Sequence, residues 1–203
     1  MRKGRGLLIV VSGPSGTGKG TVLKAFAKMN PDIVPVPSAT TRAPREGEVN
    51  SVNYFFKTRE EFEKMIEENK FVEWVVYCDN YYGTPIESLE ERLSGGFDVV
   101  LEKEVEGALK IKETYPESVI VFIAPPSMKE LRKRIEKRGT EDTTTIEQRL
   151  KRAVEEMKYL KEYDYVIIND DVEKAAQSLC CLVSTEKLRV SRNSEIIRLG
   201  GFL

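Results

Sequence analysis

The chain has 203 residues, a formal net charge of -1 and no histidine. This length suits one hydrophobic core with small appended subdomains and is short for two independent domains. A chain without histidine cannot use a histidine-based catalytic triad or a histidine-ligated metal site, and with its charges balanced it does not bind polyanions with its whole surface.

The cysteines and the N-terminal region indicate a compartment. Cys78, Cys180 and Cys181 lack the spacing of a metal site, and adjacent cysteines rarely form a disulfide, so we expect reduced thiols. The apolar run at residues 7–11 is too short for a signal peptide or a membrane span. We therefore expect a cytoplasmic protein that binds neither membranes nor nucleic acid. The oligomeric state is left open.

Strand-like apolar runs alternate with helical patterns along the chain. We expect strands at residues 7–12, 33–37 (weakened by prolines), 71–77, 97–101, 118–123 and 165–168. We expect helices at residues 21–29, 60–69, 85–93, 105–114, 127–137, 145–161 and 172–189. This alternation predicts an α/β fold with a mostly parallel sheet flanked by helices, in which ligands bind beyond the carboxyl ends of the strands.

A glycine-rich turn lies between the first predicted strand and the first predicted helix. It reads Gly13-Pro14-Ser15-Gly16-Thr17-Gly18-Lys19-Gly20-Thr21. Its glycines let backbone N–H groups point at phosphate oxygens, and the following helix N-terminus favours negative charge. Lys19 adds a full charge for the β- and γ-phosphates. We interpret the segment as a phosphate-binding loop (P-loop) for ATP; the alternative is a glycine turn with a solvated lysine.

The magnesium ligands are less clear from this loop. Gly20 stands where the P-loop pattern usually has a serine or threonine that ligates Mg²⁺. Either Thr21 takes that role or the ion keeps an extra water. Glu102, at the end of a predicted strand, could hold the ion through water. We expect Mg²⁺ as the cofactor that accompanies ATP.

Several ordered motifs follow the P-loop. They are Ser38-Ala39-Thr40-Thr41-Arg42-Ala43-Pro44-Arg45-Glu46-Gly47-Glu48, Asn53-Tyr54-Phe55-Phe56, Phe71-Val72-Glu73-Trp74, Asn80-Tyr81-Tyr82-Gly83-Thr84, Ile123-Ala124-Pro125-Pro126-Ser127, Lys137-Arg138-Gly139-Thr140-Glu141 and Val166-Ile167-Ile168-Asn169-Asp170-Asp171. In these motifs, over nearly the whole chain, the sequence resembles the guanylate kinase family, whose members transfer the γ-phosphoryl group of ATP to GMP.

The resemblance implies one domain with the P-loop nucleoside monophosphate kinase fold. Its α/β core would comprise residues 1–37, 85–133 and 153–190. A GMP-binding subdomain would span residues 38–84 and a short lid residues 134–152. Residues 191–203, with glycines at 200 and 201, would form a loose tail.

Two arginines flank a proline in the first motif. Arg42 and Arg45 carry planar guanidinium groups that can clamp a phosphate dianion, and Pro44 stiffens the loop between them. The resemblance implies that four side chains hold the phosphate of GMP and that a fifth orients them: Arg42, Arg45, Tyr54, Tyr82 and Glu48.

Guanine presents two adjacent donors, N1–H and the N2 amine, beside the acceptor O6. A carboxylate can pair with the donors and a hydroxyl with the acceptor. The resemblance implies that Glu73 is this carboxylate and that Ser38 and Thr84 are the hydroxyls. Adenine would leave Glu73 unpaired, which is costly in a buried site. The alternative for Glu73 is an exposed strand residue, and we interpret Trp74 as a packing residue.

The segment that begins at Glu102 departs from the family pattern at three positions. Lys103 stands at an apolar position, Glu104 replaces an aspartate and Glu106 replaces a glutamine. We expect Glu104 to contribute to GMP binding as the aspartate does, although its extra methylene puts the usual contact in question. Lys103 could pair with a neighbouring carboxylate.

Arginines recur on two predicted helices around residues 139–145. Arg134 and Arg138 are four residues apart, and Arg149 and Arg152 three, so each pair shares a helix face. A solvated charged helix is the ordinary interpretation of such a pattern. The resemblance implies instead that Arg134, Arg138 and Arg149 act on the transferred phosphate, with Arg138 also binding ATP, and that Asn169 contacts adenine.

These expectations describe a kinase whose partners are ATP and GMP. A GMP phosphate oxygen is already ionised near neutral pH, so the reaction needs no general base. Lys19, Arg42, the lid arginines and Mg²⁺ would cancel charge repulsion, and closure would align the reactants and exclude water. One alternative is a non-catalytic guanylate-kinase-like binding module, which would be expected to lose the P-loop lysine or the lid arginines. Another is a kinase for a different base, which Glu73 and Thr84 disfavour.

Overall fold

The computed structural model describes residues 4–31, 33, 36–137 and 142–200. Within them, one sheet forms the core and contains four parallel strands in the order β6-β1-β7-β8. These strands are β1 (Leu8–Ser12), β6 (Val99–Glu102), β7 (Val119–Ala124) and β8 (Tyr165–Ile168). Their carboxyl ends lie at one edge of the sheet, where a ligand site is expected.

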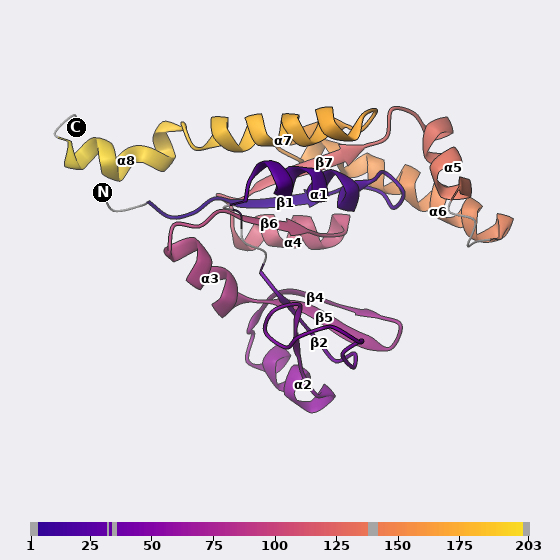
Figure 1. The fold of residues 1–203 in the computed structure, drawn as a ribbon, viewed down its shortest axis with the longest axis horizontal. Helices are drawn as coiled ribbons and strands as arrows, with labels where there is room; N and C mark the ends of the chain where they lie inside the picture. Colours follow the sequence, from indigo (N-terminus) through magenta and orange to yellow (C-terminus); the bar gives the residue numbers. More distant parts are fainter. Residues whose placement is uncertain (1–3, 32, 34–35, 138–141, 201–203) are drawn as a thin grey trace.

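Helices cover both faces of this core sheet. Alternate residues of β1 face opposite sides, so Ile9 and Val11 pack with α1 (Lys19–Met29) and α7 (Val172–Glu186). The intervening residues of β1 pack with α3 (Ile86–Ser94) and α4 (Val105–Thr114). In Figure 1, α1 and α7 lie above the sheet and α4 below it. The predicted α/β fold with a parallel sheet flanked by helices is confirmed.

A second sheet, also of four strands, lies beside the core, below it in Figure 1. Its strand order is β3-β2-β5-β4, with β2 and β3 parallel and the other neighbours antiparallel. The strands are β2 (Ser38–Thr40), β3 (Tyr54–Phe56), β4 (Phe71–Tyr77) and β5 (Asn80–Pro85). Of these four strands, the sequence analysis predicted β4 alone.

Helix α2 (Arg59–Glu67) packs on the second sheet through one aromatic residue. Phe62 is fully buried and stacks on Phe71 at 4.3 Å and on Tyr81 at 5.1 Å between ring centroids. The helix begins at a capping box, in which Thr58 and the helical residue three positions later satisfy each other's backbone N–H groups. This packing gives the 38–84 segment an apolar centre of its own.

The strand predicted at residues 33–37 is wrong. Ile33, Val36 and Pro37 lie outside any strand, and the sheet begins at Ser38. Pro37 has no N–H to donate to a ladder, which disfavours a strand here. Val36 is buried against the cluster of α3 and α4 as part of a connecting segment, which accounts for the apolar pattern.

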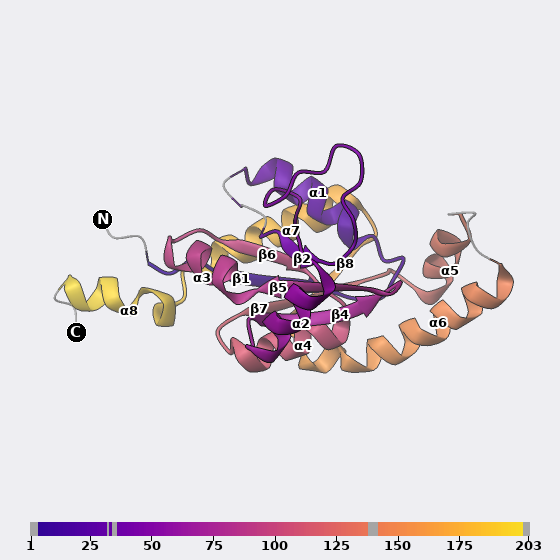
Figure 2. The same cartoon turned by 90° about the horizontal axis from the view of Figure 1, so that it is seen from below.

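Helices α5 (Met128–Lys137) and α6 (Thr143–Met157) pack on each other at one end of the molecule. Their contact is a small apolar cluster that includes Leu131, Ile135 and Leu150. A short 3₁₀ helix, η1 (Lys158–Glu162), follows α6. Figures 1 and 2 show α5 and α6 at the end opposite α8.

A last helix, α8 (Val190–Leu199), stands where we expected a loose tail over residues 191–203, so that expectation is wrong for most of the segment. The carboxylate of Glu186 at the end of α7 is almost fully buried. It pairs with the guanidinium groups of two arginines, one directly before α8 and one in its first turn. Its distances are 2.9 Å to Nε of Arg189 and 3.4 Å to Nη2 of Arg192.

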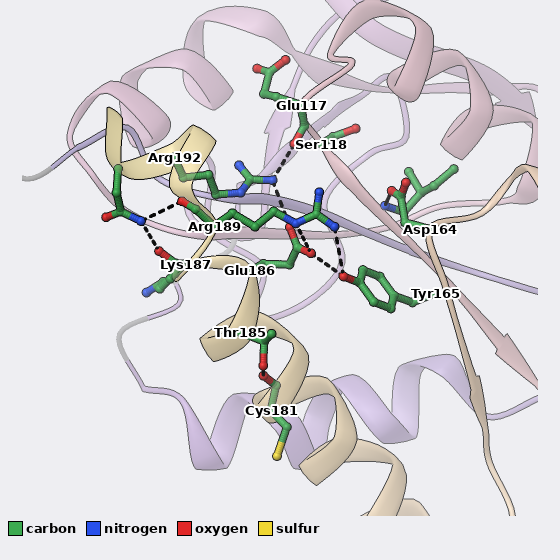
Figure 3. A network of polar contacts seen from close by, with 12 residues as sticks. Glu117, Ser118, Asp164, Tyr165, Cys181, Thr185, Glu186, Lys187, Arg189 and Arg192 are labelled. Atoms are coloured by element: carbon green, nitrogen blue, oxygen red, sulfur yellow. Dashed lines mark hydrogen bonds and ion pairs between the residues drawn. The ribbon is translucent and has the colours of Figure 1, made fainter. Parts of the chain in front are cut away.

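The same network reaches the core sheet (Figure 3). The hydroxyl of Tyr165 on β8 donates to Glu186, and Arg192 also donates to the backbone oxygen of Glu117 at 2.8 Å. These partners are far from α8 in the sequence, so composition near the chain end gives no sign of them.

Two further findings concern membrane spans and the cysteines. In the described part of the chain, no helix is long and apolar enough to cross a membrane. All three cysteines are free thiols, as predicted: Cys78, Cys180 and Cys181.

Candidate active site

The P-loop connects the end of β1 to the start of α1, and its glycines are required by its shape. Gly13 has φ 135°, and a Cβ there would lie 2.3 Å from the backbone oxygen of Ile123. Gly18, the N-cap of α1, has φ 90°. Side chains rarely adopt such angles, so only glycine lets the loop curl against the end of β7.

Lys19 begins α1 and is buried within the loop. Its Nζ donates to the backbone oxygen of Gly13 at 2.5 Å and to that of Pro14 at 3.3 Å. The hydroxyl of Thr17 donates to the same oxygen of Pro14 at 2.9 Å. The ammonium group is therefore held at the inner wall of the turn, where backbone N–H groups and the α1 N-terminus also favour an anion.

Asn169, directly after β8, is hydrogen-bonded to the P-loop. It is almost fully buried, and its Nδ2 donates to the backbone oxygen of Thr17 at 2.7 Å. The side-chain oxygen, Oδ1, is also buried and has no hydrogen-bond partner among the described residues. Asn169 thus has a loop-bracing contact that the sequence analysis did not anticipate, together with one unused acceptor.

A pocket lies beside the P-loop, and two of the residues that line it are acidic. Glycine and hydroxyl residues of the loop line it with Lys19, Lys24, Glu102 and Glu104. A Cβ on Gly20 would lie 3.5 Å from Oε2 of Glu102, so this carboxylate faces the first turn of α1.

The donors in this pocket suit magnesium held largely through water. The described residues contain no group of three or more histidine, cysteine or acidic side chains that could hold a metal. Mg²⁺ keeps several waters and takes one or two protein oxygens beside substrate phosphates. Thr21 and Glu102, which line the same pocket, supply oxygen donors of this kind.

The predicted phosphate clamp is assembled around Glu48. One oxygen of its carboxylate accepts from Nη2 of Arg42 at 2.9 Å, and the other accepts from the backbone N–H of Arg45 at 2.7 Å. These two hydrogen bonds lower the pKa of Glu48, and the carboxylate in turn raises the pKa of Arg42. The guanidinium of Arg42 lies 5.4 Å from the centre of the Tyr54 ring, and the rings of Tyr54 and Tyr82 are 6.2 Å apart.

The strand register of the second sheet explains why these side chains meet. Ser38 on β2 pairs with Tyr54 on β3, and Thr40 on β2 pairs with Tyr82 on β5. Residues 41–48 then form the loop after β2 that carries both arginines. Three strands thus bring the clamp together.

Glu73 and Thr84 lie opposite each other on β4 and β5 and are both buried. The hydroxyl of Thr84 donates to Oε1 of Glu73 at 2.9 Å. Burial excludes the alternative that Glu73 is an exposed strand residue. Trp74, next to it, is 38% exposed and packs edge-to-face against Tyr81, so its packing role is partial.

The core contributes Lys103 to this pair of residues. Its Nζ lies 2.5 Å from Oε1 of Glu73 and donates to Oγ1 of Thr84 at 2.7 Å. The sequence suggested a carboxylate partner for Lys103 without identifying it. The reason is that Lys103 follows β6 in the core, whereas both of its partners belong to the second sheet.

We expected Glu104 to contribute to GMP binding, but it does not lie with Glu73 and Thr84. It is the N-cap of α4, its side chain is exposed, and it lines the pocket beside the P-loop. Its carboxylate lies 3.7 Å from Nη2 of Arg152 on α6. Since consecutive residues at the end of β6 point in different directions, Lys103 reaches the second sheet and Glu104 faces the P-loop pocket.

The predicted lid arginines have different surroundings. Arg134 on α5 lies between Oε1 of Glu130 at 3.3 Å and the backbone oxygen of Thr17 at 3.5 Å, which places it against the P-loop. Arg149 is half-buried on α6. Arg138 lies outside the described residues.

Comparisons with known proteins agree over both sheets. A family model described as guanylate kinase matches residues 5–186. A guanylate kinase of Caldanaerobacter subterraneus subsp. tengcongensis is 54% identical over 194 residues, which are 96% of this chain and 94% of that protein. One of Bacillus subtilis is 52% identical over 94% of both chains. The crystal structure of a guanylate kinase from Anaplasma phagocytophilum, 33% identical, superposes with a TM-score of 0.71 over 94% of this chain and 90% of that one.

Proposed function

The chain belongs to the guanylate kinase family, and from this premise we propose how its residues transfer the γ-phosphoryl group of ATP to GMP, with ADP and GDP as products. The observation that supports the acceptor's identity is the buried carboxylate of Glu73 beside the hydroxyl of Thr84. A non-catalytic binding module is not favoured, because Lys19, Arg134 and Arg149 are all present.

On the ATP side, the P-loop wraps the phosphates from Gly13 to Thr21. Lys19 leaves the backbone oxygens of the loop and contacts the β- and γ-phosphates. Arg134, already against the loop, and Arg149 and Arg138 reach the same phosphates. The unused buried acceptor of Asn169, Oδ1, suits the amine of adenine.

Magnesium fits the donors of this site, with Glu102 and Thr21 holding it mainly through water. When bound, Mg²⁺ neutralises part of the phosphate charge and fixes the geometry of the triphosphate.

On the GMP side, the clamp binds the α-phosphate. Arg42 and Arg45 supply guanidinium groups, and Tyr54 and Tyr82 supply hydroxyl donors. Glu48 accepts from the guanidinium of Arg42 and from the backbone N–H of Arg45, so the Arg42 side chain and the loop that carries Arg45 are oriented before GMP arrives. The pre-organised clamp reduces the entropy that substrate binding would otherwise cost.

The base is selected at the junction of the second sheet and the core. Glu73 accepts hydrogen bonds from guanine N1–H and the N2 amine, while the hydroxyls of Thr84 and Ser38 donate to O6. Adenine presents an acceptor at N1 and a donor at position 6, and would oppose both readers.

In the chemical step, a GMP phosphate oxygen attacks the γ-phosphorus of ATP as the bond to the β-phosphate oxygen breaks. No general base is required, since the attacking oxygen is already ionised. Lys19, Arg42 and the lid arginines stabilise the charge on the transferred group. Movement of residues 38–84 and 134–152 towards the core residues aligns the reactants and excludes water. We also propose a cytoplasmic location, in keeping with the free thiols.

A coupled assay of ADP release tests this function. The purified chain is given ATP and Mg²⁺ with GMP, AMP, CMP or UMP as acceptor. We expect turnover with GMP to exceed that with every other acceptor by orders of magnitude. Equal turnover with AMP would contradict the role of Glu73, and no turnover with any acceptor would contradict the kinase function.

A further inference from the structure

The ammonium group of Lys103 lies inside the base-reading site. It contacts both the carboxylate of Glu73 and the hydroxyl of Thr84, and the side chains of Lys103 and Glu73 are only 14% and 6% exposed. Lys103 comes from the core, after β6, and is the one base-site residue in these contacts that the second sheet does not supply.

An ion pair with Glu73 alone would explain the lysine as a structural counter-charge. A buried carboxylate is costly without a partner, and Lys103 provides one. The ion pair with Glu73 does not account for the second contact of Lys103, which is to Thr84. Because an ammonium group only donates, the oxygen of Thr84 must accept from Lys103 at 2.7 Å.

This contact limits what the Thr84 hydroxyl can do. A hydroxyl has one proton and two acceptor positions, and one of these positions is taken by Lys103. Its neighbour Glu73 accepts but cannot donate when ionised, and the Thr84 proton points to its Oε1 at 2.9 Å. With one acceptor position occupied, Thr84 has only one left, and its proton, which points to Oε1, is the group that can turn to an approaching carbonyl.

We infer that Lys103 is a positioning and specificity-determining residue, which commits the Thr84 hydroxyl to donate to the carbonyl at position 6 of the purine. The inference rests on the proposed seating of guanine against Glu73. On binding, the Thr84 proton turns from Oε1 to O6, and guanine N1–H takes the released position on Oε1. Lys103 keeps both of its contacts, and the single hydrogen bond between Thr84 and Glu73 is replaced by two hydrogen bonds to the base.

A purine with an amine at position 6 cannot make this exchange. Its amine would face the committed proton of Thr84, and the nearby positive charge of Lys103 would oppose the amine's own hydrogens. Lys103 therefore acts on selection at position 6 and leaves selection at position 2, through Oε2 of Glu73, unchanged. A purely structural role would not distinguish the two positions of the ring.

The test compares three acceptors by calorimetric binding and by turnover. GMP is the reference, and IMP lacks only the amine at position 2. The nucleotide 2,6-diaminopurine ribonucleoside monophosphate keeps that amine but replaces the position-6 carbonyl by an amine, and with it the N1–H donor by an acceptor. In Lys103→Met we expect the preference for GMP over the diaminopurine nucleotide to fall about tenfold, the scale of one hydrogen bond to a charged group. The preference for GMP over IMP should stay within about twofold of wild type, since the Oε2 contact is unchanged.

Lys110→Met is the matched control. Lys110 is exposed on α4, so this variant removes the same charge outside the base site and should keep both preferences. If Lys103→Met does not fold, as judged by circular dichroism, Lys103→Gln keeps a polar partner for Glu73. Gln is shorter and cannot bridge both partners. We therefore expect the preference for GMP over the diaminopurine nucleotide to fall at least threefold, on the scale of a neutral hydrogen bond of about 1 kcal/mol.

Two results would overturn the inference. One is an unchanged preference at position 6 in the folded variant. The other is tighter GMP binding in Lys103→Met, which would mean that the lysine competes with guanine. Failure of the wild-type chain to bind or phosphorylate GMP is a different result, because it would refute the proposed function before any variant is compared.

Discussion

Replacing Glu73 by glutamine tests how the base is recognised with the least change in shape. The new side-chain oxygen can still accept from Thr84 and Lys103, as Oε1 does. The other end becomes an amide NH₂ that faces a guanine donor. The pocket should therefore remain assembled, while one of its two contacts to the base changes from attraction to opposition.

The size of the effect follows from the burial of this group. With the Glu73 side chain only 6% exposed, water cannot replace the lost acceptor. A hydrogen bond to a charged group is worth about 1.5–3 kcal/mol, which corresponds to a fall of roughly 10- to 140-fold in kcat/KM for GMP. Activity with AMP should change little, because Thr84 still donates towards position 6. The preference for GMP over AMP should shrink through loss of GMP turnover.

The measurement is kcat/KM for GMP and AMP in the coupled assay, with the melting temperature of each variant to check folding. Glu106→Gln is the matched control: Glu106 is exposed on α4, and the variant makes the same charge change without touching the base site. A folded Glu73→Gln enzyme with wild-type preference for GMP would refute the reasoning, because it would mean that residues other than Glu73 recognise the base.

Three further variants test the remaining parts of the site. Lys19→Ala should stay folded and lose about 10²–10³-fold in kcat, because a charge used on the transferred phosphate is removed. Arg42→Ala should raise KM for GMP about tenfold or more with little change in KM for ATP, since a charge-assisted contact to the acceptor phosphate is lost. Gly20→Ser should lower the Mg²⁺ concentration needed for half-maximal activity severalfold, because there is room for the side chain beside Glu102 and its hydroxyl adds an oxygen ligand.

Each of these predictions has a contrary result, and the second and third also have a control variant. Near-normal turnover in folded Lys19→Ala would exclude the ATP site proposed here. For the clamp, Arg59→Ala removes an exposed arginine of the same subdomain and should leave KM for GMP unchanged; guanosine that binds the wild type as tightly as GMP would contradict the clamp. For the metal, Gly20→Ala adds the Cβ without the hydroxyl, and an equal shift in Mg²⁺ dependence in both variants would show that the hydroxyl is not a ligand.

The core and the P-loop could be predicted because their signals are local. The β1 segment is a continuous apolar run, as a central parallel strand with both faces covered requires. The loop glycines and Lys19 follow it directly, so spacing alone placed them at the strand's carboxyl end. The alternation of apolar runs and helical patterns then predicted the parallel core.

The second sheet was mostly missed because its strands depend on partners rather than on their own pattern. β2 and β3 have three residues each, too few to show the period of two that identifies a strand. β5 begins with Asn80 and contains Gly83, both unfavourable in strands, and it is held by β4 and β2 on its two sides.

The site residues, too, could be predicted where their signals are local and not where they depend on distant partners. The residues that a motif carries together, such as Arg42, Arg45 and Glu48, lie together in the structure because the loop between them is short. Contacts across the chain were not predictable: Lys103 on Glu73 joins two sheets, and Asn169 on Thr17 joins β8 to the P-loop. Glu104 was misplaced because a pattern names positions in sequence and does not give the direction in which consecutive side chains point.

The second sheet is a single insertion, entered after Pro37 and left at Pro85, yet one of its binding pockets is completed from outside. Residues 38–84 grafted onto another P-loop protein would carry the phosphate clamp intact. They would bring Glu73 and Thr84 too, but leave Lys103 behind in the donor molecule. On the proposed assignment of these residues, the acceptor half of this enzyme is portable for phosphate and not for the base, and a chimera would inherit affinity for a nucleotide without the full means to choose which one.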